Sequence, residues 1–140
     1  MKMRESIAAA RISGPERRPD GTAVFEFRFG ADDPMFAGHF PTRPLLPGIF
    51  QLEMMRAAVE WVLICRLGVR EVSKAKFQRP IYPAEIVRME LKWSEAGDTI
   101  RARARLSVGG QQAGETTMRL WRIELKNGSS ESCSAPPCWR

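Results

Sequence analysis

One stretch of the sequence is apolar on nearly every side of a helix, which predicts that this helix is buried. Between residues 49 and 65, 13 of the 17 side chains are hydrophobic. A helix whose apolar residues surround its axis is typical of a protein core. The pair Pro47-Gly48 suits the start of such a helix, and Gly68 suits its end. The sequence therefore predicts a buried central helix over residues 48–67.

A stiff connector precedes this helix. Prolines at positions 41, 44 and 47 recur every third residue, which matches the three-residue turn of polyproline II. Proline fixes its own φ and disfavours the helical region for the residue before it. We therefore expect residues 39–47 to be extended. A Pro-x-x-Pro run can also be a ligand for a groove-type domain, although the tight apolar flanks argue against an exposed peptide.

Two titratable groups lie beside the connector. The single histidine of the chain, His39, stands at its start, and Glu53 is the first acidic residue of the helix. An imidazole can accept a proton near pH 7, and a carboxyl among apolar side chains can hold one. A structural histidine is the simpler alternative. Likewise Glu53, Arg56 and Glu60 share one helix face, which could be an ordinary solvated stripe of ion pairs.

Alternation of apolar and polar residues predicts an antiparallel sheet around the helix. Turn residues at 17–21 and the pair Gly109-Gly110 separate several of the expected strands. Strands on both sides of one long helix in the sequence indicate the α+β class. The expected strands cover residues 6–12, 23–29, 69–77, 85–93, 99–108 and 111–123.

Composition restricts the remaining possibilities. The 140 residues suffice for one domain, which we place at 1–125, and residues 126–140 read as a disordered tail. The net charge of +6 permits a polyanionic partner, but no nucleic-acid motif accompanies it. No apolar run is long enough to span a membrane. We expect a cytoplasmic protein with no nucleic-acid or membrane partner and no metal site at its three cysteines.

The connector and helix start closely resemble a known family. Residues 36–55 contain Gly-His-Phe-Pro, then Pro-x-x-Pro-Gly, then Leu-Glu-x-Met. This pattern resembles the 3-hydroxyacyl-(acyl carrier protein) dehydratases of fatty-acid synthesis. Residues 72–85 are similar to the family's Lys-Phe-x-Arg-Pro-x-x-Pro-Gly-Asp block. The resemblance implies a hot-dog fold, in which a curved antiparallel sheet wraps a long central helix.

The resemblance also implies a reaction and roles for individual residues. The reaction is loss of water from a (3R)-3-hydroxyacyl thioester to give the trans-2-enoyl thioester. His39 would be the base, and Glu53 the acid or the group that orients water. The backbone N–H of Gly48 would stabilise the thioester oxygen, with a second amide from Phe40. No metal or diffusible cofactor is required.

Subunit pairing and substrate contacts follow from the same resemblance. The histidine and the acid of each site come from different chains, so we expect a homodimer or a higher oligomer. The thioester is carried by acyl carrier protein or CoA, and a basic rim would attract the acidic carrier. The implied acyl-chain contacts are Phe40, Pro47, Ile49, Phe50 and Met54, and the implied carrier contacts are Lys74, Lys76 and Arg79.

Departures from the family pattern keep other functions open. The family commonly reads Glu-Ala-Met-Ala-Gln where this chain reads Glu53-Met-Met-Arg-Ala57, and Gly-Asp where it has Ala84-Glu85. Arg56 could hold Glu53 ionised and weaken it as an acid. These changes favour a specialised branch of acyl-chain biosynthesis over the housekeeping enzyme.

Three alternatives remain at this point. One is a non-catalytic subunit that binds an acyl chain or a carrier protein and pairs with an active paralogue. A second is a hot-dog thioesterase, although such enzymes generally lack the Gly-His-Phe-Pro run. A third is an (R)-specific enoyl-CoA hydratase, which uses an aspartate five residues before its histidine. Asp33 lies six residues before His39, so this alternative fits less well.

Overall fold

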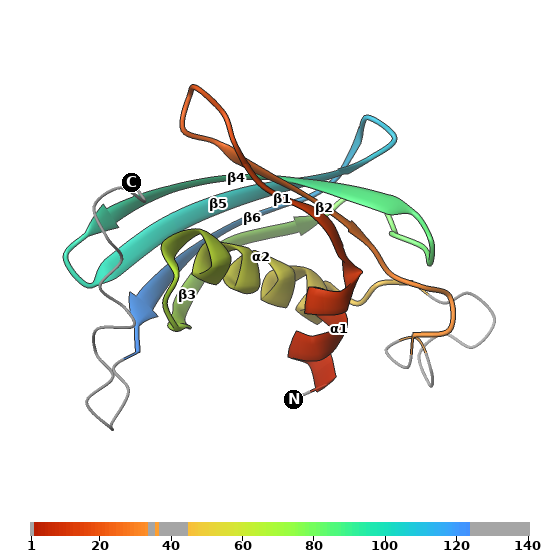
Figure 1. Cartoon of the computed structure of the whole chain (residues 1–140), viewed down its shortest axis with the longest axis horizontal. Coiled ribbons are helices and arrows are strands. Elements are labelled where there is room, and N and C mark those ends of the chain that lie inside the picture. Colours follow the sequence, from red (N-terminus) through yellow and green to blue (C-terminus); the bar gives the residue numbers. More distant parts are fainter. Residues whose placement is uncertain (1, 34–35, 37–44, 124–140) are drawn as a thin grey trace.

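A curved sheet and two helices form the two layers of the molecule. The computed structural model describes residues 2–33, 36 and 45–123. In Figure 1 the sheet arches over α2, and α1 lies at the side of α2. The elements in chain order are α1 (Lys2–Ala10), β1 (Arg11–Arg17), β2 (Ala23–Arg28), α2 (Gly48–Leu63), β3 (Leu67–Phe77), β4 (Ile86–Ala96), β5 (Thr99–Val108) and β6 (Gln111–Arg122).

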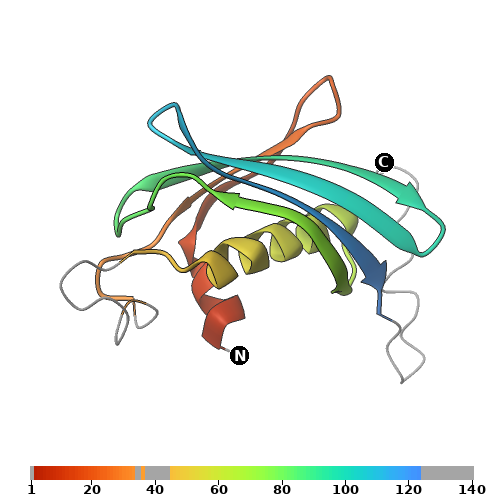
Figure 2. The same cartoon turned by 180° about the vertical axis from the view of Figure 1, so that it is seen from behind.

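The sheet is antiparallel throughout and has two free edges. Its strand order is β1-β2-β4-β5-β6-β3, so β1 and β3 lie at the edges. Figure 2 shows β3 along one margin of the sheet, beside α2. A long helix against the concave face of a curved antiparallel sheet is the hot-dog arrangement, and this prediction is confirmed.

The core fills the space between α2 and the inner face of the sheet. Strand β5 shows the two-residue period: Ile100, Ala102 and Ala104 are buried, while the arginines between them are exposed. Helix α2 faces the inner surface of the sheet and contributes Met54 and Val59, both 0% exposed, to this core. Apolar burial of this kind is the main favourable term in folding. It holds the start of α2 in a fixed place on the sheet.

The N-terminal prediction was wrong. We expected a strand at residues 6–12, but the chain forms α1 up to Ala10 and only then enters β1. Ile7 and Ala10 are three residues apart and both buried, at 0% and 6% exposed, so they occupy one helical face. A short apolar run does not distinguish a strand from a helix by periodicity alone.

The end of α2 also differs from the prediction. The helix stops at Leu63, and Ile64 adopts a left-handed conformation with φ of 55°. Its backbone N–H donates to the Glu60 carbonyl at 2.7 Å. Gly68 lies inside β3, where an added Cβ would be 2.8 Å from Nε1 of Trp121. Glycine is therefore needed there for close packing rather than for ending the helix.

The other elements follow the expected ranges closely. Strand β5 begins and ends at the predicted residues, and the remaining strands differ by a few residues at their ends. The predicted tail at 126–140 lies outside the described residues. Within the described part of the chain, no helix is both long and apolar enough to cross a bilayer.

Candidate active site

The backbone N–H of Gly48, at the start of α2, has no hydrogen-bond acceptor among the described residues. Pro47 is its N-cap, with φ of −65° and ψ of 150°, and contributes no side-chain hydrogen bond. The first N–H groups of a helix have no acceptor within the helix, and the helix dipole makes this end positive. The N–H of Gly48 is therefore suited to an oxygen that carries negative charge. The prediction that Pro47-Gly48 opens the helix is confirmed.

A phenyl ring covers the start of the helix. A Cβ added to Gly48 would lie 3.0 Å from two ring atoms of Phe77, the last residue of β3. Glycine is thus required at position 48 because of this close approach. The backbone N–H of Leu46 donates to the Ile81 carbonyl at 2.8 Å and fixes the chain that leads into the helix.

Glu53 lies in the second turn and is held by a neighbouring arginine. Nε of Arg56 donates to Oε1 of Glu53 at 3.0 Å, and Nη2 of Arg56 donates to Oε2. The Glu53 side chain is 23% exposed. This is a two-point contact between a carboxylate and a guanidinium. It is the pairing with Arg56 that the departure at position 56 led us to expect, and it replaces the alternative of a carboxyl surrounded by apolar side chains alone.

Arg56 is the centre of a buried ionic cluster that we call the Arg56 cluster: Arg4, Glu53, Arg56 and Glu60. Arg56 is only 6% exposed, and its Nη1 donates to Glu60 at 2.7 Å. Glu60 is 9% exposed, and also accepts hydrogen bonds from Arg4 at 3.0 Å and from the backbone N–H of Leu67 at 2.8 Å. The interpretation of these residues as a solvated stripe is therefore wrong.

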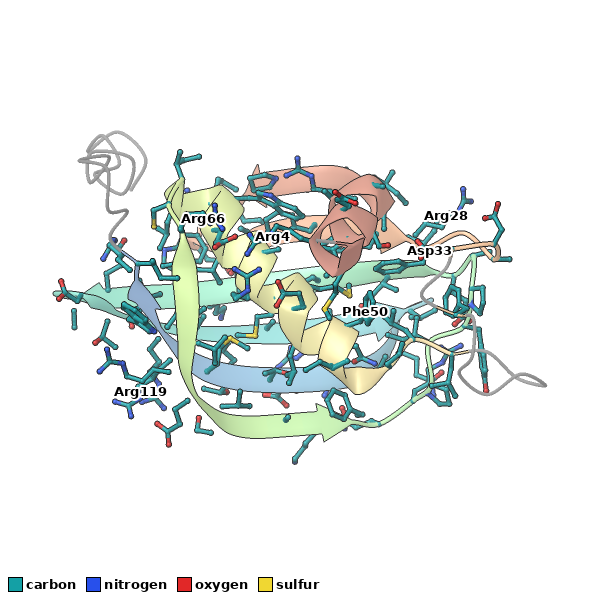
Figure 3. The ribbon with its side chains drawn as sticks, turned by 90° about the horizontal axis from the view of Figure 1, so that it is seen from below. Arg4, Arg28, Asp33, Phe50, Arg66 and Arg119 are labelled. Carbon is teal, nitrogen blue, oxygen red and sulfur yellow. The ribbon has the colours of Figure 1, made fainter. Side chains whose placement is uncertain are left out.

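The electrostatics of the cluster favour the charged guanidinium. Burial lowers the pKa of Arg56, but the hydrogen bonds from Arg56 to Glu53 and the nearby charge of Glu60 outweigh this, so the pKa is raised overall. Figure 3 shows Arg4 between α1 and α2, while Arg66 lies beyond the end of α2. Helix α1, which was not expected, thus closes one side of the cluster.

The predicted acyl-chain contacts lie in different surroundings. Ile49 is 60% exposed, Met54 is 0% exposed within the core, and Pro47 and Phe50 are partly buried. Figure 3 places Phe50 at the end of α2 nearest the Gly48 donor. His39 and Phe40 lie outside the described residues. The described residues contain no group of three side chains that could hold a metal ion.

The predicted carrier contacts separate into two groups. Lys74 and Lys76 lie on β3 opposite Thr117 and Glu115 of β6, so they share the outer face of the sheet, which points away from α2. Arg79 instead forms a two-point contact with Glu85, at 3.1 and 2.8 Å. Arg79 therefore has a structural partner in the loop before β4.

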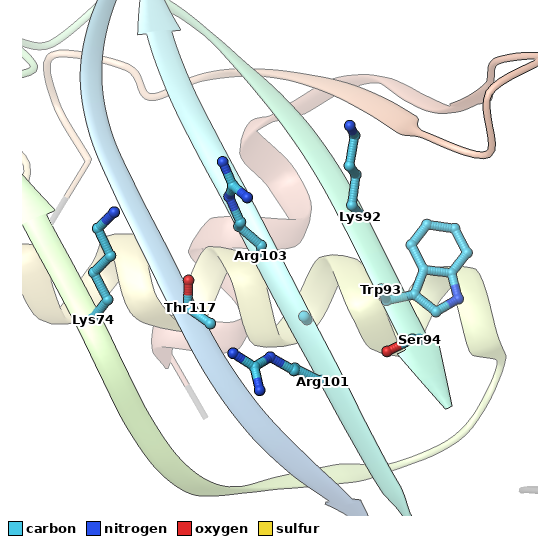
Figure 4. Close-up of a pocket in the computed structure, with 8 residues that line it drawn as sticks. Lys74, Lys92, Trp93, Ser94, Arg101, Arg103 and Thr117 are labelled. Carbon is cyan, nitrogen blue, oxygen red and sulfur yellow. The ribbon is translucent and has the colours of Figure 1, made fainter. Parts of the chain in front are cut away.

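The outer face carries a basic hollow, drawn in Figure 4. It is about 450 Å³ in volume and is lined by Lys74, Lys92, Trp93, Ser94, Arg101, Ala102, Arg103 and Thr117. Glu115 lies beside it, 3.5 Å from Lys74 and 3.3 Å from Arg103. Desolvation raises the pKa of Glu115, but these two cations outweigh it, so the pKa is lowered.

Sequence reasoning missed three residues around Gly48. Phe77 and Gly114 are opposite each other on β3 and β6, and Gln51 is buried one turn into α2. Gln51 carried a usable signal, because it is an uncharged polar residue inside an apolar run. The proximity of Phe77 and Gly114 to the helix depends on how the sheet curves, which local sequence does not state.

Comparisons with known proteins agree on one family. The model of the ApeI-like family, described as ApeI dehydratase, matches residues 15–114. The 3-hydroxyacyl-(acyl-carrier-protein) dehydratase FabZ of Hydrogenobaculum sp. (strain Y04AAS1) is 30% identical over 106 residues, covering 69% of this chain and 72% of the relative. The FabZ of Acidiphilium cryptum (strain JF-5) is 27% identical over 120 residues, covering 79% and 73% respectively.

A solved structure shares the fold. It is the dehydratase heterocomplex ApeI:P from Xenorhabdus doucetiae, and the likeness has a TM-score of 0.67 at 24% identity. The match covers 80% of this chain and 96% of the other. At this level of identity the likeness concerns the fold alone.

Proposed function

The chain belongs to the ApeI-like family of dehydratases, and from this we propose that it converts (3R)-3-hydroxyacyl-(acyl carrier protein) thioesters to trans-2-enoyl thioesters. The observation that carries the proposal is the start of α2. There an unpaired backbone N–H at Gly48 and the carboxylate of Glu53 lie within two turns of one helix. The curated relatives named above are dehydratases of 3-hydroxyacyl carrier-protein substrates, which supports the same chemistry.

The first step is removal of a proton from C2. His39 takes this proton, because a neutral imidazole is a competent base near pH 7. Negative charge then develops on the thioester oxygen, and the Gly48 N–H, aided by the Phe40 amide, stabilises it. The positive end of the α2 dipole acts in the same direction.

The second step is loss of the 3-hydroxyl group. Because Arg56 donates two hydrogen bonds to Glu53, we assign Glu53 the role of an acceptor that orients the departing water rather than that of an acid. The protonated His39 then returns its proton to the hydroxyl oxygen. The C3–O bond breaks, water leaves, and the electron pair from C2 forms the double bond between C2 and C3.

The acyl chain runs past Pro47, Ile49 and Phe50 toward Met54 in this proposal. The partial burial of Phe50 and the flexibility of an unbranched methionine suit a chain of variable shape. Met54 is fully buried in the single chain, so a long acyl chain would have to enter the core beside it.

Two copies of the chain form the working unit in this proposal. Edge strand β3 exposes Val69, Val72 and Phe77 at 42%, 40% and 50%. An exposed strand edge with apolar residues favours pairing with another strand. Because Phe77 covers Gly48, a partner on this edge would lie next to the candidate site, in line with a histidine and an acid from different chains.

Carrier protein binds the basic outer face in this proposal. Lys74 belongs to the hollow of Figure 4 together with Arg101 and Arg103, and Lys76 extends the same face. An acidic carrier would be attracted to this surface over several ångströms. Arg79, which is already bound to Glu85, contributes to the loop rather than to docking.

Turnover of a defined thioester tests the proposal. The purified protein is incubated with 3-hydroxyacyl carrier-protein thioesters of several lengths, and enoyl absorbance and free thiol are followed together. We expect enoyl product from the wild type and its loss in His39→Ala and Glu53→Gln, with folding checked by circular dichroism.

Thiol release without enoyl product would indicate a thioesterase instead. No turnover at any chain length would favour the non-catalytic subunit, in keeping with the heterocomplex reported for the solved neighbour.

A further inference from the structure

One buried acceptor near the start of α2 lacks a hydrogen-bond donor. Gln51 is 5% exposed, yet its side-chain oxygen Oε1 accepts no hydrogen bond from the described residues. A buried acceptor without a donor destabilises a protein, because the group has lost its water without gaining a partner. Such atoms are uncommon in folded proteins and need an explanation.

The orientation of this amide follows from its neighbour. Nε2 of Gln51 lies 3.5 Å from the backbone oxygen of Leu46. A carbonyl oxygen can only accept, so turning the amide over would place two acceptors together. The donor side of the amide therefore faces Leu46, and the acceptor side is left unpaired.

The unpaired oxygen lies in a space kept open by a glycine. A Cβ added to Gly114 would be 3.2 Å from Oε1 of Gln51 and 3.0 Å from the backbone oxygen of Lys76. Gly114 is opposite Phe77 in the sheet, and Phe77 covers Gly48. The unpaired acceptor and the unpaired N–H at the start of α2 thus belong to one small region.

We propose that Gln51 determines specificity for a hydroxylated acyl chain, with Oε1 accepting a hydrogen bond from the substrate 3-hydroxyl. This rests on the proposed function, since it takes the thioester oxygen to be bound at Gly48. Gly48 and Gln51 are three residues apart and lie on the same side of α2, so an acyl segment held at Gly48 would lie next to Gln51. An enoyl or saturated chain would leave Oε1 unpaired and bind less tightly.

Binding of unreactive analogues tests this inference. The probes are the amide analogues of 3-hydroxyacyl-pantetheine and of the matching saturated acyl-pantetheine, with six, eight and ten carbons, in which nitrogen replaces the thioester sulfur. Calorimetry gives the ratio of the two affinities. The variants are Gln51→Met and Gln51→Leu, which keep an apolar side chain of similar size. Gln112→Met is the matched control, because Gln112 already donates to Gln78 at 2.7 Å.

We expect the wild type to prefer the hydroxylated analogue by about fivefold to tenfold, the worth of one hydrogen bond. The preference should fall to near one in both Gln51 variants and persist in Gln112→Met. The ligand-free melting temperature of the Gln51 variants should change little, because removal of the unpaired acceptor offsets loss of the Nε2 contact with Leu46. An unchanged preference in those variants, or no preference in the wild type, would overturn the inference.

The analogues are not turned over, so this result does not depend on catalysis. A wild type that lacks dehydratase activity but loses its hydroxyl preference on mutation would refute the proposed reaction alone. A wild type that is active but keeps its preference in the Gln51 variants would refute the role of Gln51 alone.

Discussion

Arg56 links two carboxylates inside the protein. It contacts Glu53 and Glu60 while being 6% exposed, so its loss would leave two partly buried carboxylates without their main partner. Breaking a buried ion pair from one side is far more costly than losing an exposed one. Arg56→Met should therefore lower the free energy of unfolding by about 3 kcal/mol, as measured by urea denaturation at pH 7.

Arg66 provides the matched control for this variant. Its Nε lies 3.9 Å from Glu60, but its side chain is 56% exposed. Arg66→Met should change the free energy of unfolding by no more than about 0.5 kcal/mol. Equal effects of the two variants would show that burial of Arg56 contributes nothing to stability.

Ile64 occupies a backbone conformation that disfavours its side chain. Its φ of 55° follows the last turn of α2, and its side chain is 46% exposed, so little packing depends on it. A left-handed conformation costs an L residue about 1–2 kcal/mol, whereas glycine adopts it freely. Ile64→Gly should raise the free energy of unfolding by about 0.5 to 1 kcal/mol, after the greater chain entropy of glycine is subtracted.

Ile64→Ala is the comparison for the helix end. Alanine keeps the unfavourable conformation and loses the small remaining contact, so this variant should be no more stable than the wild type. Parallel chemical denaturation curves would check both variants. A gain from alanine equal to that from glycine would point to the side chain rather than the backbone.

The loop before β4 depends on one ionised carboxylate. Hydrogen bonds from Arg79 lower the pKa of Glu85; partial burial opposes this, and the backbone N–H of Tyr82 assists it. Because the native state binds this proton less tightly than the unfolded chain, the stabilisation is complete above the unfolded pKa near 4.3 and is lost as pH falls through the native value.

Glu85→Gln should accordingly be less stable than the wild type at pH 7, and the two should converge as the pH falls through the lowered native pKa of Glu85. Thermal unfolding across this pH range measures the difference. Glu71→Gln, which removes an exposed pair with Arg119, should have a much smaller effect. A constant gap between wild type and Glu85→Gln at every pH would contradict the assignment.

Edge strand β3 is the proposed dimer interface, and substitutions on it can be compared with one on the opposite edge strand, β1. Strand β3 exposes Val69 and Val72, and the proposed dimer pairs along this edge. The double variant Val69→Lys/Val72→Lys should be monomeric by light scattering and inactive, because like charges would face each other across the interface. Ile12→Lys, on the opposite edge at 51% exposed, should remain dimeric. A dimeric double variant would place the interface elsewhere.

One group of cations lies on the outer face of the sheet. The outer face of the sheet carries Arg101, Arg103 and Lys74 around the hollow of Figure 4. Arg101→Glu should raise KM several-fold for the carrier-protein thioester and leave KM for a pantetheine thioester unchanged. Arg66→Glu, an exposed cation at the far end of α2, should alter neither value. An equal rise for both substrates would contradict docking on the outer face.

The sequence predicted those elements that depend only on neighbouring residues in the chain. The alternation in β5 fixed both of its ends, and Pro47-Gly48 fixed the start of α2. The spacing of Glu53, Arg56 and Glu60 placed them on one face of α2, but it did not reveal that α1 covers this face. Arg56 reads as solvated until α1 is in place, because Arg4 reaches Glu60 across 56 positions in sequence.

The candidate site also contains residues that the sequence predicted and residues that only the fold brings together. Gly48 and Glu53 follow from the family pattern at the helix start. Phe77 and Gly114 lie near the start of α2 only because β3 and β6 curve around the helix. The unpaired oxygen of Gln51 is a property of three elements together, and no single segment of sequence contains it.

The two edges of the sheet differ in whether a strand of another copy can pair with them, and this difference limits how far the sheet can extend. Strand β1 contains Pro15, which has no N–H to donate. Strand β3 has no proline. A sheet with two receptive margins could add copies indefinitely and become a fibre. With one receptive margin, the proposed symmetric pair would leave neither sheet edge open, so the sheet itself would stop extending at two copies.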